Sequence, residues 1–113
     1  MSKVVMDQPS SVLDYRNDAD WERMAKLLVR TRRMKPGKWY RLNIRCTPPG
    51  GKKVLLMQVR RKVLGVYPHI VHFETPYGSR ESYTHGEVAL GLDKVPEGTE
   101  IVSEETYRAM MEG

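Results

Sequence analysis

Histidine and cysteine side chains are the first candidates for metal or acid–base chemistry in this sequence. His69 and His72 are three residues apart on an expected strand, and strand residues an odd number apart point to opposite faces. The two imidazoles therefore do not converge on one ion unless a bulge intervenes. Cys46 is the only cysteine and falls on the inward side of its expected strand. A Cys46/His69/His72 cluster stays open as an alternative, but we expect structural histidines, a buried thiol, no metal and no cofactor.

A stretch rich in hydroxyl groups is the second candidate, here for nucleophilic catalysis. The side chains involved are those of Ser79, Ser82, Thr84, Glu81 and His85. No nucleophile elbow or oxyanion loop precedes them, and closeness along a chain is not triad geometry. The sequence also has no Walker loop, no GxGxxG motif and no acidic pair at metal-binding spacing. We therefore predict that the protein is not an enzyme.

Positive charge is concentrated between residues 23 and 62. This stretch holds 14 of the 19 lysines and arginines and no aspartate or glutamate. The other 73 residues hold five bases and all 14 acids, so the net charge of +5 conceals a strongly polarised chain. A clustered positive field attracts polyanions and steers them at long range.

A helix is predicted from residue 18 to residue 33. Asn17 or Asp18 provides an N-cap, and Pro36-Gly37 follows a basic last turn. Apolar residues at helical spacing predict an inward side made of Trp21, Met24, Ala25, Leu28 and, less centrally, Leu27. The opposite side carries Arg23, Lys26, Arg30 and Arg33. The helix is thus expected to be apolar towards the core and basic towards solvent.

Two strands are predicted to follow as an antiparallel hairpin. Successive side chains of residues 39–46 are expected to point to opposite faces of the strand, with Tyr40, Leu42, Ile44 and Cys46 inward and Trp39, Arg41, Asn43 and Arg45 outward. The second strand runs from Lys53 to about Val66, with Leu55, Met57 and Val59 in the core. Between them, Gly50-Gly51-Lys52-Lys53 follows two prolines and enters a strand, which favours a hairpin turn with exposed lysines over a phosphate-binding loop.

The remaining elements are short. Gly65 and Pro68 indicate a bulge or bend before strands over residues 69–74 and 80–83. Thr84 and Glu87 have capping-box spacing and open a single helical turn that Gly91 stops, and Ser103 caps a terminal helix after an edge strand at 100–102. We predict an α+β fold with an N-terminal amphipathic helix packed on a small, strongly bent antiparallel sheet or SH3-like half-barrel.

Length and composition predict one soluble domain. The content of 40% apolar and 29% charged residues is that of a globular protein, and one cysteine fits a reducing cytoplasm. We expect residues 1–16 to be a flexible N-terminal arm and residues 17–113 to form the helix-plus-barrel domain. Residues 1–11 contain no apolar run typical of a signal peptide, and no run is long enough to span a membrane.

The outward residues of the helix and hairpin form the predicted binding surface. Cations neutralise phosphates while an exposed indole offers a stacking plane, the combination used for single-stranded nucleic acid. The absence of an RNP signature, a GXXG clamp and a helix-turn-helix spacing predicts contact without base specificity. In the alternative interpretation, Trp39 packs under the helix and the arginines are ordinary surface charge. The predicted binding residues are Arg23, Lys26, Arg30, Arg33, Lys38, Trp39, Arg41, Arg45, Lys52, Lys53, Arg60 and Lys62.

The second half of the chain carries a recognisable pattern. It consists of VLGVYPHIVHFE at residues 63–74, YGSRESYT at 77–84 and VAL at 88–90. The pattern resembles small uncharacterised proteins encoded on phages, prophages and plasmids of Gram-positive bacteria, over roughly residues 54–91. The matching positions are Tyr67, His69, Phe73, Arg80, Glu81 and Tyr83. The resemblance implies a mobile-element accessory protein in the cytoplasm of a bacterial host, and it implies no active site.

Two functions are compatible with these observations. The first is a non-enzymatic accessory protein that binds the phosphate backbone of RNA or DNA. The second is a phage-encoded inhibitor of a host nuclease or ribonucleoprotein defence complex, of the anti-CRISPR or anti-restriction kind, which binds protein or guide RNA. Both require the same positive surface, whereas a plain structural protein would use its charge only for solubility. No membrane partner is expected, and the sequence does not predict an oligomeric state.

Overall fold

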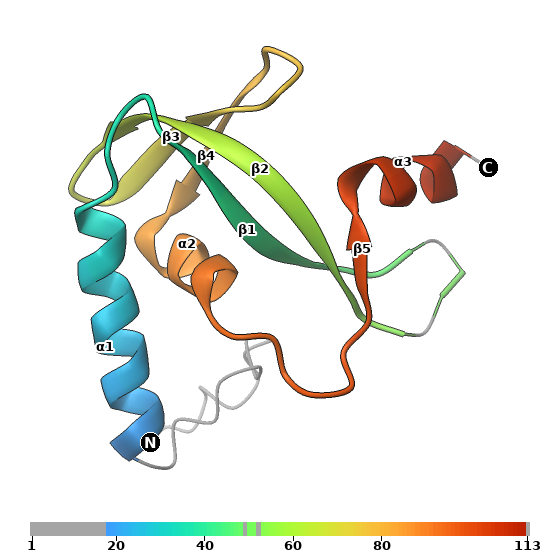
Figure 1. Cartoon of the computed structure of the whole chain (residues 1–113), viewed down its shortest axis with the longest axis horizontal. Helices are drawn as coiled ribbons and strands as arrows, with labels where there is room; N and C mark the ends of the chain where they lie inside the picture. The colour runs from blue at the N-terminus through green and yellow to red at the C-terminus, as the bar shows by residue number, and fades with distance from the viewer. Residues whose placement is uncertain (1–17, 49, 52, 113) are drawn as a thin grey trace.

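The computed structural model describes residues 18–48, 50–51 and 53–112, and it has the predicted α+β fold (Figure 1). The expected N-terminal arm and Lys52 lie outside the described residues. The elements are α1 (Asp18–Arg32), β1 (Trp39–Cys46), β2 (Leu55–Val66), β3 (Ile70–Glu74), β4 (Arg80–Thr84), α2 (His85–Leu92), β5 (Ile101–Ser103) and α3 (Glu104–Glu112).

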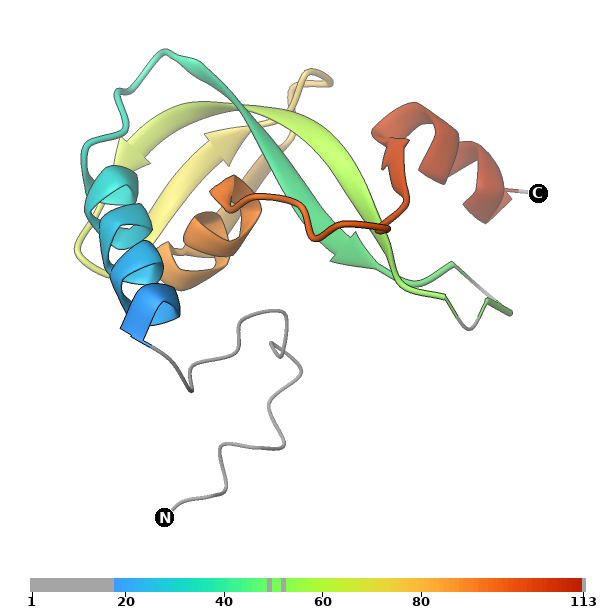
Figure 2. The same ribbon diagram turned by 60° about the horizontal axis from the view of Figure 1, so that its bottom comes forward.

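The strands form one bent sheet in the order β1-β2-β3-β4, all antiparallel (Figures 1 and 2). β5 pairs in parallel with the first part of β2, a pairing that the sequence did not indicate. The register of β2 against β3 shifts between Val63 and Gly65, which confirms the predicted bulge. A Cβ on Gly65 would lie 2.8 Å from the ring of Tyr67, so a larger residue there would displace that ring from its place over the strand.

The hydrophobic core lies between one face of the sheet and α2. This inner face carries Leu42 of β1, Val59 and Val63 of β2, and Val71 and Phe73 of β3, and Val88 of α2 packs against them. Leu55 is buried, and Tyr40, Ile44 and Met57 pack at the edges of the core, while Trp39, Arg41 and Arg45 are exposed. The predicted alternation is therefore confirmed for most of the hairpin, whereas Asn43, expected outward, and Cys46, expected to be buried, are both half-buried.

The N-terminal helix packs on α2, and its inward side differs from the predicted one. Met24 is buried against Ala89, with Leu27 and Leu28 beside it. Trp21, with 57% of its surface exposed, and Ala25, also exposed, were wrongly assigned to this side. α1 has 15 residues and α2 has eight, which gives lengths of about 22 and 12 Å, so the longer helix extends past its partner.

A polar contact fixes the rotation of α1. Thr31 is fully buried, and its hydroxyl lies 2.8 Å from Nδ1 of His85 and 2.8 Å from the carbonyl oxygen of Leu28. The spacing of apolar residues does not reveal that Thr31 faces inward, because threonine is not counted among the apolar residues from which the inward side of a helix is predicted. The helix consequently turns its Met24–Thr31 side towards α2.

The second helix begins as predicted and ends later. The Thr84 hydroxyl accepts from the Glu87 amide at 3.1 Å and the Glu87 carboxylate accepts from the Thr84 amide at 2.8 Å, which completes the capping box. The predicted stop at Gly91 is wrong, because the helix continues to Leu92. Gly91 is buried, and a Cβ there would lie 3.3 Å from the Cβ of Leu42. The glycine thus permits close helix–sheet packing, and the helix ends after it.

Candidate nucleic-acid interface

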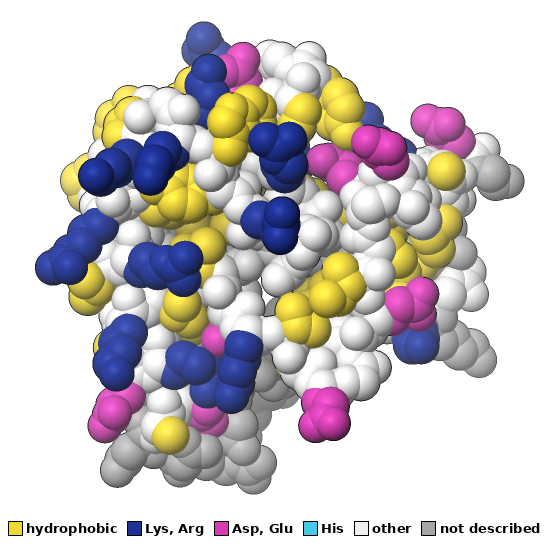
Figure 3. Space-filling model, viewed as in Figure 1, with side chains coloured by type: hydrophobic (Ala, Val, Ile, Leu, Met, Phe, Trp, Pro, Cys, Tyr) yellow, Lys and Arg dark blue, Asp and Glu magenta, His cyan; other side chains and the backbone are white. Residues whose placement is uncertain are grey.

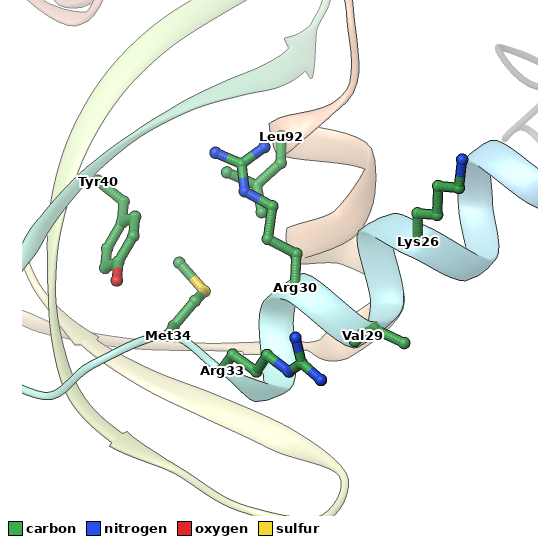
Figure 4. A pocket seen from close by; sticks show the side chains of 7 residues that line it. All are labelled: Lys26, Val29, Arg30, Arg33, Met34, Tyr40 and Leu92. Atoms are coloured by element: carbon green, nitrogen blue, oxygen red, sulfur yellow. The ribbon is translucent and has the colours of Figure 1, made fainter.

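Three of the predicted cations surround a pocket between α1, β1 and the end of α2. Lys26, Arg30 and Arg33 line a hollow of about 260 Å³ whose other walls are Val29, Met34, Tyr40 and Leu92. Figure 4 shows the Arg30 side chain extending towards Leu92, with Met34 and Tyr40 on the neighbouring wall. The Tyr40 hydroxyl accepts a hydrogen bond from the Lys35 amide at 3.0 Å, which holds the ring in place. We call Lys26, Arg30 and Arg33 the helix patch.

A second group of cations lies on the outer face of the hairpin. Trp39 and Arg41 of β1 are paired across the strands with Lys62 and Arg60 of β2, so the four side chains share one face. The Arg60 guanidinium lies 5.1 Å from the centre of the Trp39 ring, at cation–π distance, and the indole is 42% exposed. Trp39 does not pack under the helix. We call Trp39, Arg41 and Arg60 the strand patch.

The two patches lie on opposite sides of β1. Tyr40, which lines the pocket, alternates with Trp39 and Arg41, and successive strand residues point to opposite faces. β1 pairs only with β2 among the described strands, so it forms an edge of the sheet. Figure 3 shows Lys and Arg side chains gathered over α1 and the neighbouring sheet, while Asp and Glu lie mainly at the bottom of the view and near α3. The predicted single surface is thus divided in two by an edge strand.

The predicted cations differ in whether a carboxylate neutralises them. Arg23 donates to Asp20 at 2.8 Å and to Asp93 at 2.9 Å, Lys53 lies 3.3 Å from Glu100, and Lys62 lies 3.6 Å from Glu74. Arg23 therefore faces Asp93 beyond the end of α2, away from the predicted outward side. Arg45 is exposed on the outward side of β1. Among the predicted binding residues that the structure describes, the exposed cations that form no ion pair with a described carboxylate are Lys26, Arg30, Arg33, Lys38, Arg41 and Arg60.

One cation of the basic block is buried in the core. Arg61 lies on the inward side of β2, and only 2% of its surface is exposed. Its guanidinium donates to both oxygens of Glu104 at 3.0 and 2.9 Å, and its Nε donates to Glu81 at 2.9 Å. This cluster attaches α3 to the sheet. The signal for it was available in the sequence, since Arg61 follows the inward positions Leu55, Met57 and Val59 at the same spacing of two.

The ionisation of this cluster follows from its contacts. Burial alone would lower the pKa of Arg61, but hydrogen bonds to Glu104 and Glu81 outweigh it and raise that pKa. Burial would raise the pKa of Glu81, but the hydrogen bonds from Arg61 and Tyr83 lower it overall. Burial, together with the 2.7 Å hydrogen bond to Glu81, raises the pKa of Tyr83 to about 12. The cluster therefore keeps its charges and phenol proton at neutral pH.

The histidines and the cysteine lie apart. His69 is exposed in the turn after β2, whereas Cys46 pairs with Leu55 at the other end of that strand. His72 contacts the Ser82 hydroxyl at 2.6 Å, and the ring of buried His85 lies between Thr31 and the Tyr67 carbonyl oxygen. Burial raises the pKa of the Cys46 thiol. Within the described residues, no group of three or more His, Cys, Asp or Glu side chains is placed to hold a metal ion.

Comparison with known proteins identifies no relative. No protein-family model matches the chain, and no curated protein and no solved structure is significantly similar to it. Function therefore has to be argued from the site itself.

The two patches offer anion binding and aromatic stacking. Exposed ammonium and guanidinium groups bind phosphate oxygens, and guanidinium groups do so with two parallel hydrogen bonds. The rings of Tyr40 and Trp39 lie beside these cations, one on each side of β1. None of the described helices has the length and apolar content needed to cross a membrane.

Proposed function

We propose that the protein binds nucleic acid without catalysing a reaction, and that the helix patch and the strand patch contact the phosphate backbone. The observation that carries the proposal is that six of the predicted binding cations are exposed in these two patches and at Lys38 and lack an ion pair with any described carboxylate. A basic surface that serves only solubility normally mixes the two signs of charge. Lys53 and Lys62 have carboxylate partners, whereas the three cations around the pocket and Arg41 and Arg60 of the strand patch do not.

The exposed cations of the two patches are better suited to bind the phosphate backbone than the edges of bases. Lys and Arg side chains that neutralise phosphates fix position and supply affinity, but they carry no sequence information. The helix patch lies around a pocket at the side of α1, and the sequence has no helix-turn-helix spacing. The resemblance of roughly residues 54–91 to small proteins encoded on phages, prophages and plasmids favours a role on a mobile genetic element.

The test is a salt series with purified protein and labelled DNA and RNA oligonucleotides. The logarithm of the affinity is expected to fall linearly with the logarithm of salt between about 50 and 200 mM, with a slope of about −0.7 to −0.9 per phosphate contacted. No binding at the lowest salt concentration, or binding that salt does not change, would contradict the proposal.

Charge reversal in the helix patch provides the matched variant. Arg30→Glu with Arg33→Glu is expected to weaken binding by about tenfold or more for every oligonucleotide sequence and to make the salt slope shallower. Arg80→Glu with Lys94→Glu is the control, because it changes the net charge equally at exposed positions outside the two patches. Equal losses in the two double variants would show that only net charge matters.

A further inference from the structure

A ligand that contacts both patches has to pass over the edge of the sheet. The helix patch lies on the inner side of β1 and the strand patch lies on its outer side. Lys38, an exposed cation, directly precedes β1, and its carbonyl oxygen accepts from the Val63 amide at 2.9 Å. This bond places Lys38 at the end of the hairpin, where the chain comes from α1 into the edge strand. Positive charge is therefore available on both sides of β1 and at its beginning.

The pocket at the helix patch has both charged and apolar walls, and a phosphate group alone would contact only the charged ones. Its cations stand around a hollow whose remaining walls are the apolar side chains of Val29, Met34 and Leu92 and the ring of Tyr40. A phosphate gains nothing from apolar walls, whereas a nucleobase has a flat apolar face and polar edges. The bases of a duplex are stacked on one another and cannot enter without unpairing.

We propose that the natural ligand of the two patches is a single strand of nucleic acid that folds over β1. One base enters the pocket beside Tyr40, the adjoining phosphates bind the helix patch, and the strand continues past Lys38 to the outer face. There, a second base stacks on Trp39 while Arg41 and Arg60 bind phosphates. A duplex has a persistence length of about 50 nm and does not bend around an edge strand, whereas single strands turn freely between nucleotides. This inference rests on the proposed function and names its ligand.

Tryptophan fluorescence tests the path of the strand directly. The chain has two tryptophans, both exposed, so Trp21→Phe leaves Trp39 as the only indole reporter. Binding of a single-stranded oligonucleotide to this variant is expected to quench the fluorescence, because the base stacks on the indole. A duplex of the same sequence is expected to leave it unchanged. Unchanged fluorescence at saturating single strand would overturn the proposed path.

Affinities of matched variants test whether both patches act together. Arg30→Glu and Arg41→Glu, one on each side of β1, are each expected to weaken single-strand binding by about tenfold, and Trp39→Ala by about tenfold as well. Trp21→Ala is the matched aromatic control and is expected to leave affinity unchanged, and circular dichroism checks that every variant is folded. Equal affinity for single strand and duplex, with equal losses in the variants, would overturn this inference and leave the proposed function intact. Binding of neither ligand would overturn the proposed function.

Discussion

At the scale of single residues, adjacent arginines of β2 have opposite roles. Arg60 points outward and lies over the Trp39 ring, whereas Arg61 points inward and is surrounded by Glu81, Glu104 and the Arg60 carbonyl oxygen. An arginine at an inward strand position has to be paired, because an unpaired buried charge is strongly destabilising. The count of charges in the basic block did not distinguish the two residues, but their alternation along the strand does.

The same substitution is expected to have different effects at Arg60 and at Arg61. Arg61→Met removes the buried cation that Glu81 and Glu104 share and leaves Glu104 only its 3.7 Å ion pair with the more exposed Arg108. We expect a loss of about 3–5 kcal/mol in the free energy of unfolding. Arg60→Met is expected to cost less than about 1 kcal/mol, because it removes only an exposed cation–π contact. Urea denaturation of both variants measures the difference. The effect on affinity for single-stranded DNA should be the reverse. Arg60→Met is expected to bind more weakly than Arg61→Met, measured under conditions in which both variants are folded.

At the scale of elements, α2 links the core to the candidate pocket. Its first residue, His85, contacts Thr31 of α1, its middle packs on the sheet, and its last residue, Leu92, lines the pocket. The sequence predicted how this helix begins, because a capping box is a local pattern of two residues. It did not predict how the helix ends, because the close approach of Gly91 to Leu42 is made by residues far apart in sequence.

The capping box gives the prediction at this scale. Thr84→Ala is expected to destabilise the protein by about 1 kcal/mol, since the Glu87 amide loses its acceptor at an exposed position where little packing is lost. Thr84→Ser keeps the hydroxyl and should retain most of that stability. Thermal or urea denaturation of the three proteins measures the difference. An equal loss in Thr84→Ser would mean that the methyl group, and not the cap, matters at this position.

At the scale of the whole molecule, local patterns in the sequence predicted the fold class and the order of elements. Strand alternation in the hairpin was read correctly because the hairpin has one buried face and one exposed face. The sequence did not show that α1 packs on α2 or that β5 joins β2 in parallel, because an apolar stripe does not specify its partner. For the same reason, the basic residues were expected on one surface. Their division between two sides of β1 emerges only once the helix is placed on the inner side of the sheet.

The distribution of charge also predicts how the stability of the whole protein depends on pH. The pKa of Glu81 in the folded protein lies below the ordinary value of 4.5, so the free energy that it contributes is present above that value. It is lost as the pH falls through the lowered pKa, because protonation of the carboxylate breaks its ion pair with Arg61. Protonation of the other carboxylates adds net positive charge and general repulsion at the same time. Glu81→Gln separates the two effects.

The difference in unfolding free energy between the wild type and Glu81→Gln should be largest near neutral pH and shrink as the pH falls below 4.5. General repulsion is nearly the same in both proteins and does not alter this difference. Glu105→Gln, a change at an exposed neighbour of Glu104, should remain close to wild type at every pH. Urea titrations at a series of pH values give these differences directly. A constant difference between wild type and Glu81→Gln would show that the Glu81 carboxylate is not stabilised by Arg61.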